Sequence, residues 1–388
     1  MHSNARSPCA WRQLKGDRTR HQKVSACVRI SGQNLPLSIL KNNKRSRKMR
    51  YAVLGAGTIG SFLGGMLQAG GNPVWFVGRS TQAHLIAQEG LHLRNLKGGR
   101  RYFDGAQLHF GDDPSVLANA DCILVTVKSQ DTASAAEVLR RHAPESAIIV
   151  SFQNGVRNAG QLKARLPHKI IPGMVPFNVI QPHPGDLRQV SSGHLAIQAS
   201  PFSEQIQKDF KAGGLPLDIH ERMEPVQWSK LLLNLNNAIN ALSGLPLRTM
   251  LLNPGYRKAL AAAQREALRV IEQAGFQTVR LGAIVPELSP YLLHLPTPLF
   301  RLIANAALAI DPDAGSSMQD DLRLGKKTEV EYINGEVTHL ADKLGAPCPV
   351  NRTLMDLIKQ AETEGRDYRK LSAQDILNAI TTACAAEE

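Results

Sequence analysis

The residues best suited to chemistry lie in segment 228–240, where polar side chains interrupt an apolar run. Lys230, Asn234 and Asn237 follow one another at steps of four and three, so in a helix they share one face. Asparagine is a poor helix former, so its repeated use here favours a stripe that lines a cleft over a solvated helix edge. A lysine in such a cleft can protonate a carbonyl oxygen that becomes an alkoxide as hydride reaches its carbon. The stripe therefore predicts a general acid.

A second polar stretch, 316–329, contains Ser317 and Glu329. Ser317 is suited to capping a helix and to facing a substrate carboxylate. The two residues are twelve positions apart, which is about 18 Å along an unbroken helix. They can meet one small ligand only if the chain bends or if Ser317 precedes the helix; otherwise Glu329 is a surface carboxylate.

The element that would hold a cofactor opposite these groups is the glycine turn Gly55–Gly60 (GAGTIG). It follows the apolar run 51–54, and a helical pattern and a second apolar run, 74–77, come after it. This is the order of a βαβ unit, in which the glycines permit a tight turn, close approach to a pyrophosphate and close helix packing. The anion would lie at the helix N-terminus. The context raises the value of a motif that is weak alone.

Three polar residues stand at predicted strand ends, where ligands of open α/β sheets bind. Arg79 occupies the place where NAD enzymes usually carry an acid, and no acid adjoins it in the sequence, so a 2′-phosphate and NADPH are favoured over a solvated loop residue. Lys128 faces either the adenosine phosphate or a neighbouring carboxylate, or is a solvated strand end. Asn154 binds the nicotinamide ribose or the substrate, or is a turn residue.

The chain has 388 residues, enough for two domains, and a net charge of +13. Residues 1–50 contain thirteen Lys/Arg and one acid, whereas the remainder is nearly neutral, so the total does not indicate a basic patch on the folded body. Five scattered cysteines, without a C-x-x-C or a histidine cluster, favour reduced thiols in a cytoplasmic protein and no metal site. No apolar run is long enough to span a membrane.

We expect residues 1–48 to be a disordered basic extension, because they lack hydrophobic periodicity. Met49, directly before the first strand, favours an artefactual upstream segment; a targeting segment and a nucleic-acid arm are the alternatives. Alternating strands and helices predict a doubly wound α/β domain over 49–220, with a looped antiparallel extension of the sheet around 172–193. From 221 to 388 helical patterns dominate and predict an all-helical domain, with one of its patterns running over 317–343.

At this point the chain, from Met49 to about Lys359, resembles the ketopantoate reductase (2-dehydropantoate 2-reductase) family. The resemblance rests on six pieces of sequence: GAGTIG at 55–60, Val127-Lys128, QNG at 153–155, WSKL at 228–231 with Asn234, SSM at 316–318 and TEVEYING at 328–335. It implies a Rossmann-like NADP-binding domain and an all-α C-terminal domain of the 6-phosphogluconate dehydrogenase C-terminal-like type. It also implies NADPH-dependent reduction of a 2-keto acid, 2-dehydropantoate to pantoate, in pantothenate biosynthesis.

The resemblance implies Lys230 as the general acid and Glu329 as a second essential group that binds the substrate hydroxyl. The cofactor would be held by Gly55, Ala56, Gly57, Thr58, Ile59, Gly60, Arg79, Lys128 and Asn154. The substrate would be held by Asn154, Lys230, Asn234, Ser317 and Glu329, together with Asn237 or Asn240.

The sequence departs from the family pattern at Ala238, where a second asparagine is usual, followed by proline. Asn237 and Asn240 flank this place, and by helical phase Asn237 lies nearer the Lys230 face. The departure leaves the exact keto acid open, so a paralogous reductase of another small keto acid is an alternative. An NADPH-binding sensor is another, although a sensor needs no general acid. Partners would be the substrate and a second copy in a homodimer, with no nucleic acid and no membrane.

Overall fold

The computed structural model describes residues 27–30, 33–36, 48–282, 285–303 and 314–387. Contacts divide the chain into two units, 1–47 and 48–388. In the first unit β1 (Cys27–Ile30) and β2 (Gln33–Pro36) pair antiparallel as a two-stranded hairpin. The prediction of disorder for 1–48 otherwise falls on residues outside the described ones. Disorder of this segment stays a prediction, since an isolated two-stranded hairpin is marginally stable at best in water.

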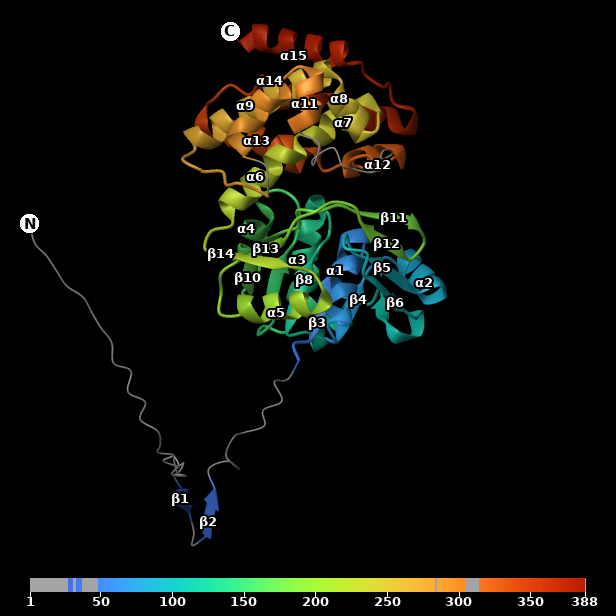
Figure 1. Ribbon diagram of the computed structural model, residues 1–388, viewed down its shortest axis with the longest axis vertical. Coiled ribbons are helices and arrows are strands. Elements are labelled where there is room, and N and C mark those ends of the chain that lie inside the picture. Colours follow the sequence, from blue (N-terminus) through green and yellow to red (C-terminus); the bar gives the residue numbers. More distant parts are fainter. Residues whose placement is uncertain (1–26, 31–32, 37–47, 283–284, 304–313, 388) are drawn as a thin grey trace, which may run out of the picture. The chain divides into compact units, whose positions relative to one another are not determined.

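The sheet half of the second unit is built on an eight-stranded sheet in the order β14-β13-β10-β9-β8-β3-β4-β7 (Figure 1). Its strands are β3 (Tyr51–Leu54), β4 (Val74–Val77), β7 (His109–Gly111), β8 (Cys122–Val125), β9 (Ile148–Ser151), β10 (Lys169–Met174), β13 (Leu195–Gln198) and β14 (Leu217–His220). Every pair is parallel except β10 with β13. The chain runs outward from β3 through β4 to β7 and then returns to β8 on the other side of β3. The strand order therefore reverses between β3 and β8, where doubly wound sheets bind ligands.

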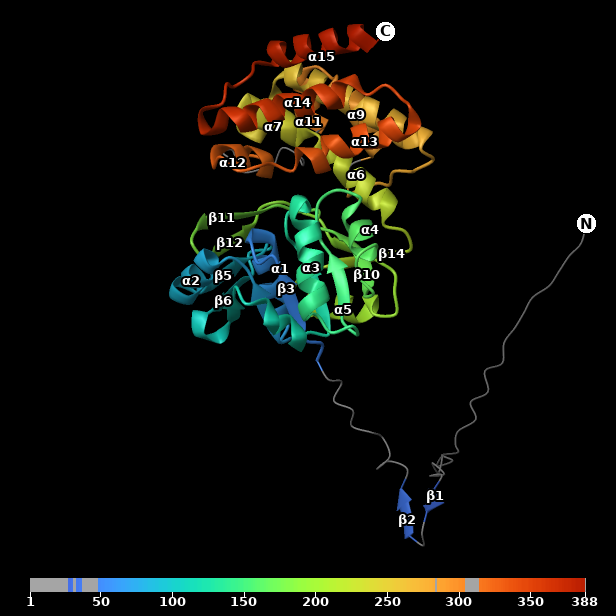
Figure 2. The ribbon, with the colours of Figure 1, turned by 180° about the vertical axis from the view of Figure 1, so that it is seen from behind.

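Helices cover both faces of this sheet, which explains why its central strands are apolar throughout. Tyr51 and Val53 join the core under α1 and α5, whereas Ala52 and Leu54 join the core under α3 and α4. Figure 2 shows α3 lying across the second face. The helices of this half are α1 (Thr58–Ala69), α2 (Ser80–Glu89), α3 (Thr132–His142), α4 (Asn158–Lys163) and α5 (Ser203–Gly213), with 3-10 turns η2 (Gly105–Gln107), η3 (Pro114–Asn119) and η4 (Ser129–Asp131).

A second sheet of four strands, in the order β11-β12-β5-β6, packs against α1. It contains β5 (Leu91–Arg94), β6 (Arg100–Phe103), β11 (Val179–His183) and β12 (Asp186–Gln189). The sequence predicts an antiparallel extension of the main sheet around 172–193, and this prediction is wrong. The hairpin β11–β12 instead pairs with β5, because β12 runs parallel to β5 in register Leu187 to Leu93 and buries both leucines.

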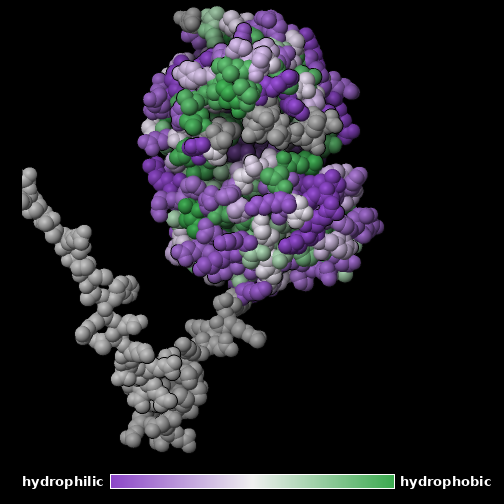
Figure 3. Space-filling model, viewed as in Figure 1, coloured by the Kyte–Doolittle hydropathy of each residue, from purple (hydrophilic) through white to green (hydrophobic). Residues whose placement is uncertain are grey.

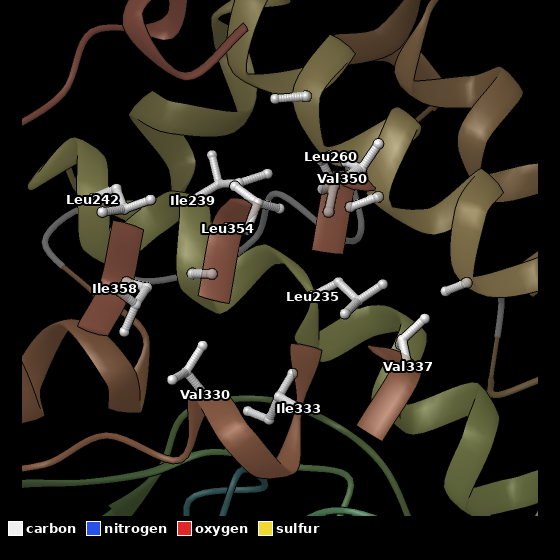
Figure 4. Close-up of a cluster of buried hydrophobic side chains, with 14 of the residues drawn as sticks. Leu235, Ile239, Leu242, Leu260, Val330, Ile333, Val337, Val350, Leu354 and Ile358 are labelled. Carbon is white, nitrogen blue, oxygen red and sulfur yellow. The ribbon is translucent and has the colours of Figure 1, made fainter. Parts of the chain in front are cut away.

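From α6 onward the chain is helical, as predicted. The elements are α6 (Glu224–Asn234), α7 (Asn236–Ser243), α8 (Leu247–Leu252), α9 (Pro254–Gln273), η5 (Pro286–Leu288), α10 (Ser289–Leu293), α11 (Thr297–Ile303), α12 (Ser317–Arg323), η6 (Val330–Tyr332), α13 (Asn334–Leu344), α14 (Pro349–Glu364), η7 (Gly365–Asp367) and α15 (Ala373–Glu387). Figure 4 shows the core of this half, in which side chains of α7, α9, α13 and α14 converge with those of the η6 turn. The predicted domain boundary at residue 220 falls between β14 and α6.

The single helix predicted over 317–343 is wrong, because the chain breaks it twice. Gly325 takes a left-handed conformation (φ +65°), and Leu324 ends α12. A stretch of loop and the η6 turn then lead into α13. The bend places Glu329 beside the sheet half. Ser317 and Glu329 are therefore not held about 18 Å apart by one unbroken helix, as the twelve-residue spacing would otherwise require.

Candidate active site

The glycine turn between β3 and α1 uses each glycine for a different reason. Gly55 has φ +101°, and a Cβ there would lie 2.5 Å from the amide nitrogen of Val127. A Cβ on Gly60 would lie 2.4 Å from both the Gly55 carbonyl oxygen and Thr126 Oγ1. A Cβ on Gly57 would meet no protein atom within 4 Å, and Gly57 begins α1 without a side-chain cap. The open N-terminus of α1 can therefore accept a pyrophosphate.

Arg79 follows β4 after one intervening residue, Gly78, and stands at the N-cap position of α2 with its side chain exposed. The acid that the sequence lacks at this place comes from another strand. Ser80 Oγ donates to Asp112 Oδ2 at 2.5 Å, and Asp112 follows β7, the neighbour of β4 in the sheet. Sequence reading missed Asp112 because the two strand ends are brought together only by the sheet.

Lys128 follows β8, and its ammonium group is held by the helical half. It forms an ion pair with Asp321 of α12 at 2.5 Å and donates to the Lys327 carbonyl oxygen at 3.3 Å. Of the two partners that the sequence left open, the structure gives Lys128 the carboxylate. In this conformation Lys128 is a bridge between the two halves, and a role in cofactor binding stays a prediction.

A pocket lies between the ends of β9 and β10 and the helix α6. It is lined by Gln153, Asn154, Gly155, Met174, Val175, Gln227, Lys230, Leu231, Asn234 and Ile333. Four of these residues come from α6 at helical spacing, so one face of α6 forms a wall. The pocket thus brings together three of the predicted site residues, Lys230, Asn234 and Asn154.

Lys230 is partly buried and donates to the carbonyl oxygen of Pro176 at 3.2 Å. Burial, which disfavours the charged ammonium, lowers the pKa of Lys230 from its ordinary 10.5 to about 8. An amine with a pKa near neutral pH gives up its proton more readily than an ordinary lysine, while it is still mostly protonated. One hydrogen bond to Pro176 leaves two of its three donors available.

Glu329 is tied to the sheet half by three hydrogen bonds. Its Oε1 accepts from the Ser129 amide at 2.9 Å and from Ser129 Oγ at 2.8 Å, and its Oε2 accepts from Asn154 Nδ2 at 3.0 Å. Because Asn154 lines the pocket of Lys230, Glu329 is connected to that pocket through one side chain. Ser129 was missed by sequence reading, although its position next to Lys128 at a strand end was a usable signal.

The turn that carries Asn154 is fixed from both sides. Gly155 has φ +81°, and a Cβ there would lie 2.9 Å from the Tyr332 carbonyl oxygen. Arg157 Nε donates to Glu336 Oε2 at 2.6 Å, a second ionic bridge between the halves. Burial raises the pKa of Glu336 to about 7, against the opposing effect of Arg157.

Three predicted residues lie elsewhere. The cap of α12 is Ser316, whose Oγ accepts from the Gln319 amide at 3.2 Å, so the prediction that Ser317 caps the helix is wrong; Ser317 is exposed in the first turn. Asn240 is fully buried, and both ends of its amide bind main chain, at Leu245 O and at the Ser316 amide. The structure therefore gives Asn240 a packing role instead of the predicted place at the substrate.

Asn237 is almost fully buried and does not line the pocket. The helix expected to carry the polar stripe of segment 228–240 is divided at Leu235, between α6 and α7. Leu235 keeps a right-handed helical conformation, so it is the burial of Asn237 that separates its side chain from the pocket. Of the pocket residues that the sequence missed, Gln227 could have been found from its spacing three before Lys230, whereas Met174 and Ile333 carry no signal.

Among the described residues, His, Cys, Asp and Glu side chains form no group of three or more that could hold a metal ion. Within the described part of the chain, no helix combines the length and the apolar character needed to cross a bilayer.

Comparisons with known proteins agree with this geometry. The family model described as "Ketopantoate reductase PanE/ApbA" matches residues 51–201, and its C-terminal counterpart matches residues 222–362. The chain is 30% identical to a 2-dehydropantoate 2-reductase of Halobacterium salinarum, an alignment that covers 82% of this chain and all of that protein. It is 25% identical to a 2-dehydropantoate 2-reductase of Archaeoglobus fulgidus, over 82% of this chain and 99% of the relative.

Solved structures show the same fold. A PanE/ApbA family ketopantoate reductase from Ralstonia eutropha superposes with a TM-score of 0.70 at 28% identity, covering 81% of this chain and 99% of the other. A D-mandelate dehydrogenase solved with NADH and anilino(oxo)acetate gives 0.67 at 18% identity, covering 81% and 99%. A dimeric ketopantoate reductase from Staphylococcus aureus gives 0.62 at 17% identity, covering 81% and 99%. The two family models together cover most of the chain, and the chain belongs to the ketopantoate reductase family.

Proposed function

We propose that this protein is an NADPH-dependent reductase that converts a 2-keto acid into the corresponding 2-hydroxy acid, with 2-dehydropantoate and pantoate as the pair suggested by its relatives. The observation that carries the proposal is Lys230, an amine with a pKa of about 8 in one pocket with Asn154 and Asn234. The reaction takes one hydride and one proton, and it leaves a hydroxyl in place of the ketone and an oxidised nicotinamide. NADPH, when bound at the glycine turn, supplies the hydride.

Lys230 supplies the proton. Its ammonium group attracts the keto oxygen, stabilises negative charge as it develops there, and transfers a proton to that oxygen. The Pro176 carbonyl holds the ammonium in place without neutralising it, because a carbonyl carries no net charge. The neutral amine that remains takes up a proton from solvent before the next turnover.

Glu329 and the asparagines position the substrate in this proposal. Glu329 can accept a hydrogen bond from a substrate hydroxyl, and Asn154 and Asn234 offer amide donors to a keto acid in the pocket. Ser317, exposed at the start of α12, keeps its proposed contact with the carboxylate only if substrate reaches from the pocket to that helix. Asn237 contributes to substrate binding only if its buried side chain becomes accessible from the pocket.

NADPH is preferred over NADH in this proposal because Arg79 stands exposed at the end of β4. A guanidinium at this place binds a 2′-phosphate through paired hydrogen bonds. Replacing Arg79 by Ala should raise the Michaelis constant for NADPH far more than that for NADH. Equal use of both cofactors by the unaltered enzyme would contradict the proposed preference for NADPH.

The test of the proposed function is NADPH consumption by purified protein with a panel of small 2-keto acids. Turnover of 2-dehydropantoate well above that of the others supports the family activity. Faster turnover of a different keto acid supports the paralogue, which the missing second asparagine at Ala238 makes a real alternative. Tight NADPH binding without turnover of any keto acid in the panel would support an NADPH-binding sensor and contradict the proposed reductase activity.

The proposal extends to a homodimer formed in the cytoplasm. Large apolar side chains are exposed together on η5, α10 and α11, among them Leu288, Tyr291, Leu299, Leu302 and Ile303. Figure 3 shows hydrophobic surface gathered on the helical half around α11. Exposed apolar surface of this kind is typical of association sites. Light scattering of the purified protein that gave a monomer mass at micromolar concentration would contradict the dimer.

A further inference from the structure

The adenosine end of the proposed cofactor site carries an acid that no single stretch of sequence reveals. Val77 at the end of β4 pairs with Gly111 at the end of β7, and the Gly78 amide donates to the Gly111 carbonyl oxygen at 2.8 Å. The two chains therefore leave the sheet side by side, one into Arg79 and Ser80 and the other into Asp112. The Ser80 hydroxyl closes the gap with its 2.5 Å hydrogen bond to Asp112 Oδ2.

These groups favour opposite ligands. Arg79 offers positive charge to a 2′-phosphate, whereas Asp112 repels a phosphate dianion and can accept a hydrogen bond from a ribose hydroxyl. The proton of Ser80 is used by Asp112, so Ser80 Oγ presents acceptor lone pairs outward. In that state Ser80 can accept from a ribose hydroxyl but cannot donate to a phosphate oxygen.

We propose that Asp112, together with the Ser80 hydroxyl that it holds, is a specificity-determining residue that restrains the preference for NADPH and lets the site bind NADH. The inference rests on the proposed function only in that a nicotinamide dinucleotide binds at the Gly55–Gly60 turn. It assigns the choice between the two cofactors to a balance between Arg79 and Asp112, where sequence reading gave Arg79 alone.

The test is the Asp112→Asn variant, with dissociation constants for NADPH and NADH measured from nicotinamide fluorescence in the absence of keto acid. Removing the charge and freeing the Ser80 proton should tighten NADPH binding about five- to tenfold at low salt. NADH binding should weaken a few-fold. Because the groups are exposed, the gain for NADPH should shrink at about 1 M salt, where charges are screened within roughly 3 Å.

The matched control is Asp113→Asn, which changes the same charge one residue further on. Asp113 is occupied elsewhere: its Oδ1 accepts from the Ser115 amide at 2.9 Å and its Oδ2 from Ser115 Oγ at 2.6 Å, at the start of η3. Asparagine keeps a capping oxygen there. Asp113→Asn should therefore leave the ratio of the two constants unchanged.

The outcomes separate the inference from the proposed function. An unchanged or reduced preference for NADPH in Asp112→Asn, or an equal shift in Asp113→Asn, overturns the role of Asp112 while the reductase stands. Ser80→Ala should weaken NADH and leave NADPH nearly unchanged; the reverse result also overturns the role. An unaltered protein that binds neither dinucleotide removes the reductase and this inference together.

Discussion

The nucleotide end and the substrate end of the proposed site are built in different ways. The nucleotide end is mostly backbone: one stretch of chain, from β3 to β4, makes the turn, the open helix N-terminus and the position of Arg79. The substrate end is made of side chains from both halves, and its bonds join residues such as Ser129 and Glu329 that are 200 positions apart. Damage at the first end should therefore act on cofactor binding, and damage at the second on substrate binding and proton transfer.

The substrate end also shares its polar groups with the contacts that join the two halves. Lys128 with Asp321, Ser129 and Asn154 with Glu329, and Arg157 with Glu336 all cross from the sheet half to the helical half. A substrate that binds Asn154 or Glu329 therefore uses side chains that already hold the two halves together. The affinity for substrate is therefore coupled to the stability of the contacts between the two halves. The glycine turn lies within the sheet half, so no such coupling is expected there.

The largest effect is expected from Lys230→Ala, which removes the proton donor. The turnover number should fall about 10²-fold or more. The dissociation constant for NADPH should not change, since the cofactor phosphates would lie at the sheet half. Turnover of 2-dehydropantoate and related keto acids at the unaltered rate would show that this account of the substrate end is wrong.

The pH dependence of the same pair of proteins sharpens this test. Lys230 donates as an ammonium with a pKa of about 8, so its protonated fraction is nearly full below pH 7 and falls as pH rises through 8. In the unaltered enzyme kcat/KM for reduction should therefore decline about tenfold per pH unit well above 8. The residual activity of Lys230→Ala should lack that decline; an identical profile in both would assign the titration to another group.

A somewhat smaller loss is expected from Glu329→Gln, with more of it in substrate affinity than Lys230→Ala shows. The amide keeps the shape but cannot accept at both oxygens, so one of the bonds from Ser129 and Asn154 is lost, at a cost of about 1–3 kcal/mol or roughly ten- to hundredfold in kcat/KM. The control is Glu331→Gln, two residues away, whose exposed carboxylate pairs with Lys359. If both variants lost the same kcat/KM, the loss would come from removing a negative charge in this region and not from the hydrogen bonds of Glu329.

Substitutions in the glycine turn should weaken cofactor binding while leaving the proton donor in place, so they should lower the turnover number less than Lys230→Ala does. Gly57→Ala adds a methyl that meets no protein atom within 4 Å, so the melting temperature should stay the same while NADPH binding weakens about tenfold. Gly60→Ala adds a methyl 2.4 Å from two oxygens, so it should destabilise the fold by about 1–3 kcal/mol as well. Unweakened NADPH binding in Gly57→Ala would show that the pyrophosphate does not approach that backbone.

The same division explains what the sequence could predict. The first two strands, the glycine turn, and the helical character of the second half follow from local patterns, since apolar runs and breakers act over a few residues. The bend at Gly325 was missed because charged residues on both sides continue a helical pattern. Asn240 was misjudged because its amide serves main-chain groups near 245 and 316, and such contacts exist only once α7 and α12 are packed. Asp112 was missed because it comes near Ser80 only when β4 and β7 pair in the sheet.

The smallest effect is expected outside both ends of the site, from removing residues 1–48. Met49 is partly buried against the sheet core, whereas Lys48 contributes one exposed hydrogen bond to the Gly71 carbonyl oxygen. Protein that begins at Met49 should therefore keep its activity and its melting temperature.

A slightly shorter form, beginning at Tyr51 after an added methionine, is the control for this truncation. It loses Met49 and has methionine in place of Arg50, so the guanidinium that pairs with Asp121 at 2.7 Å is gone, whereas the main-chain carbonyl that accepts from the Asp121 amide at 2.8 Å remains. This form should melt about 2–4 °C lower, because an exposed pair and its neighbouring bonds are worth about 1 kcal/mol. If the form beginning at Met49 already lost stability or turnover, the basic segment would belong to the folded enzyme, and the account of the charge as an addition to a nearly neutral body would fail.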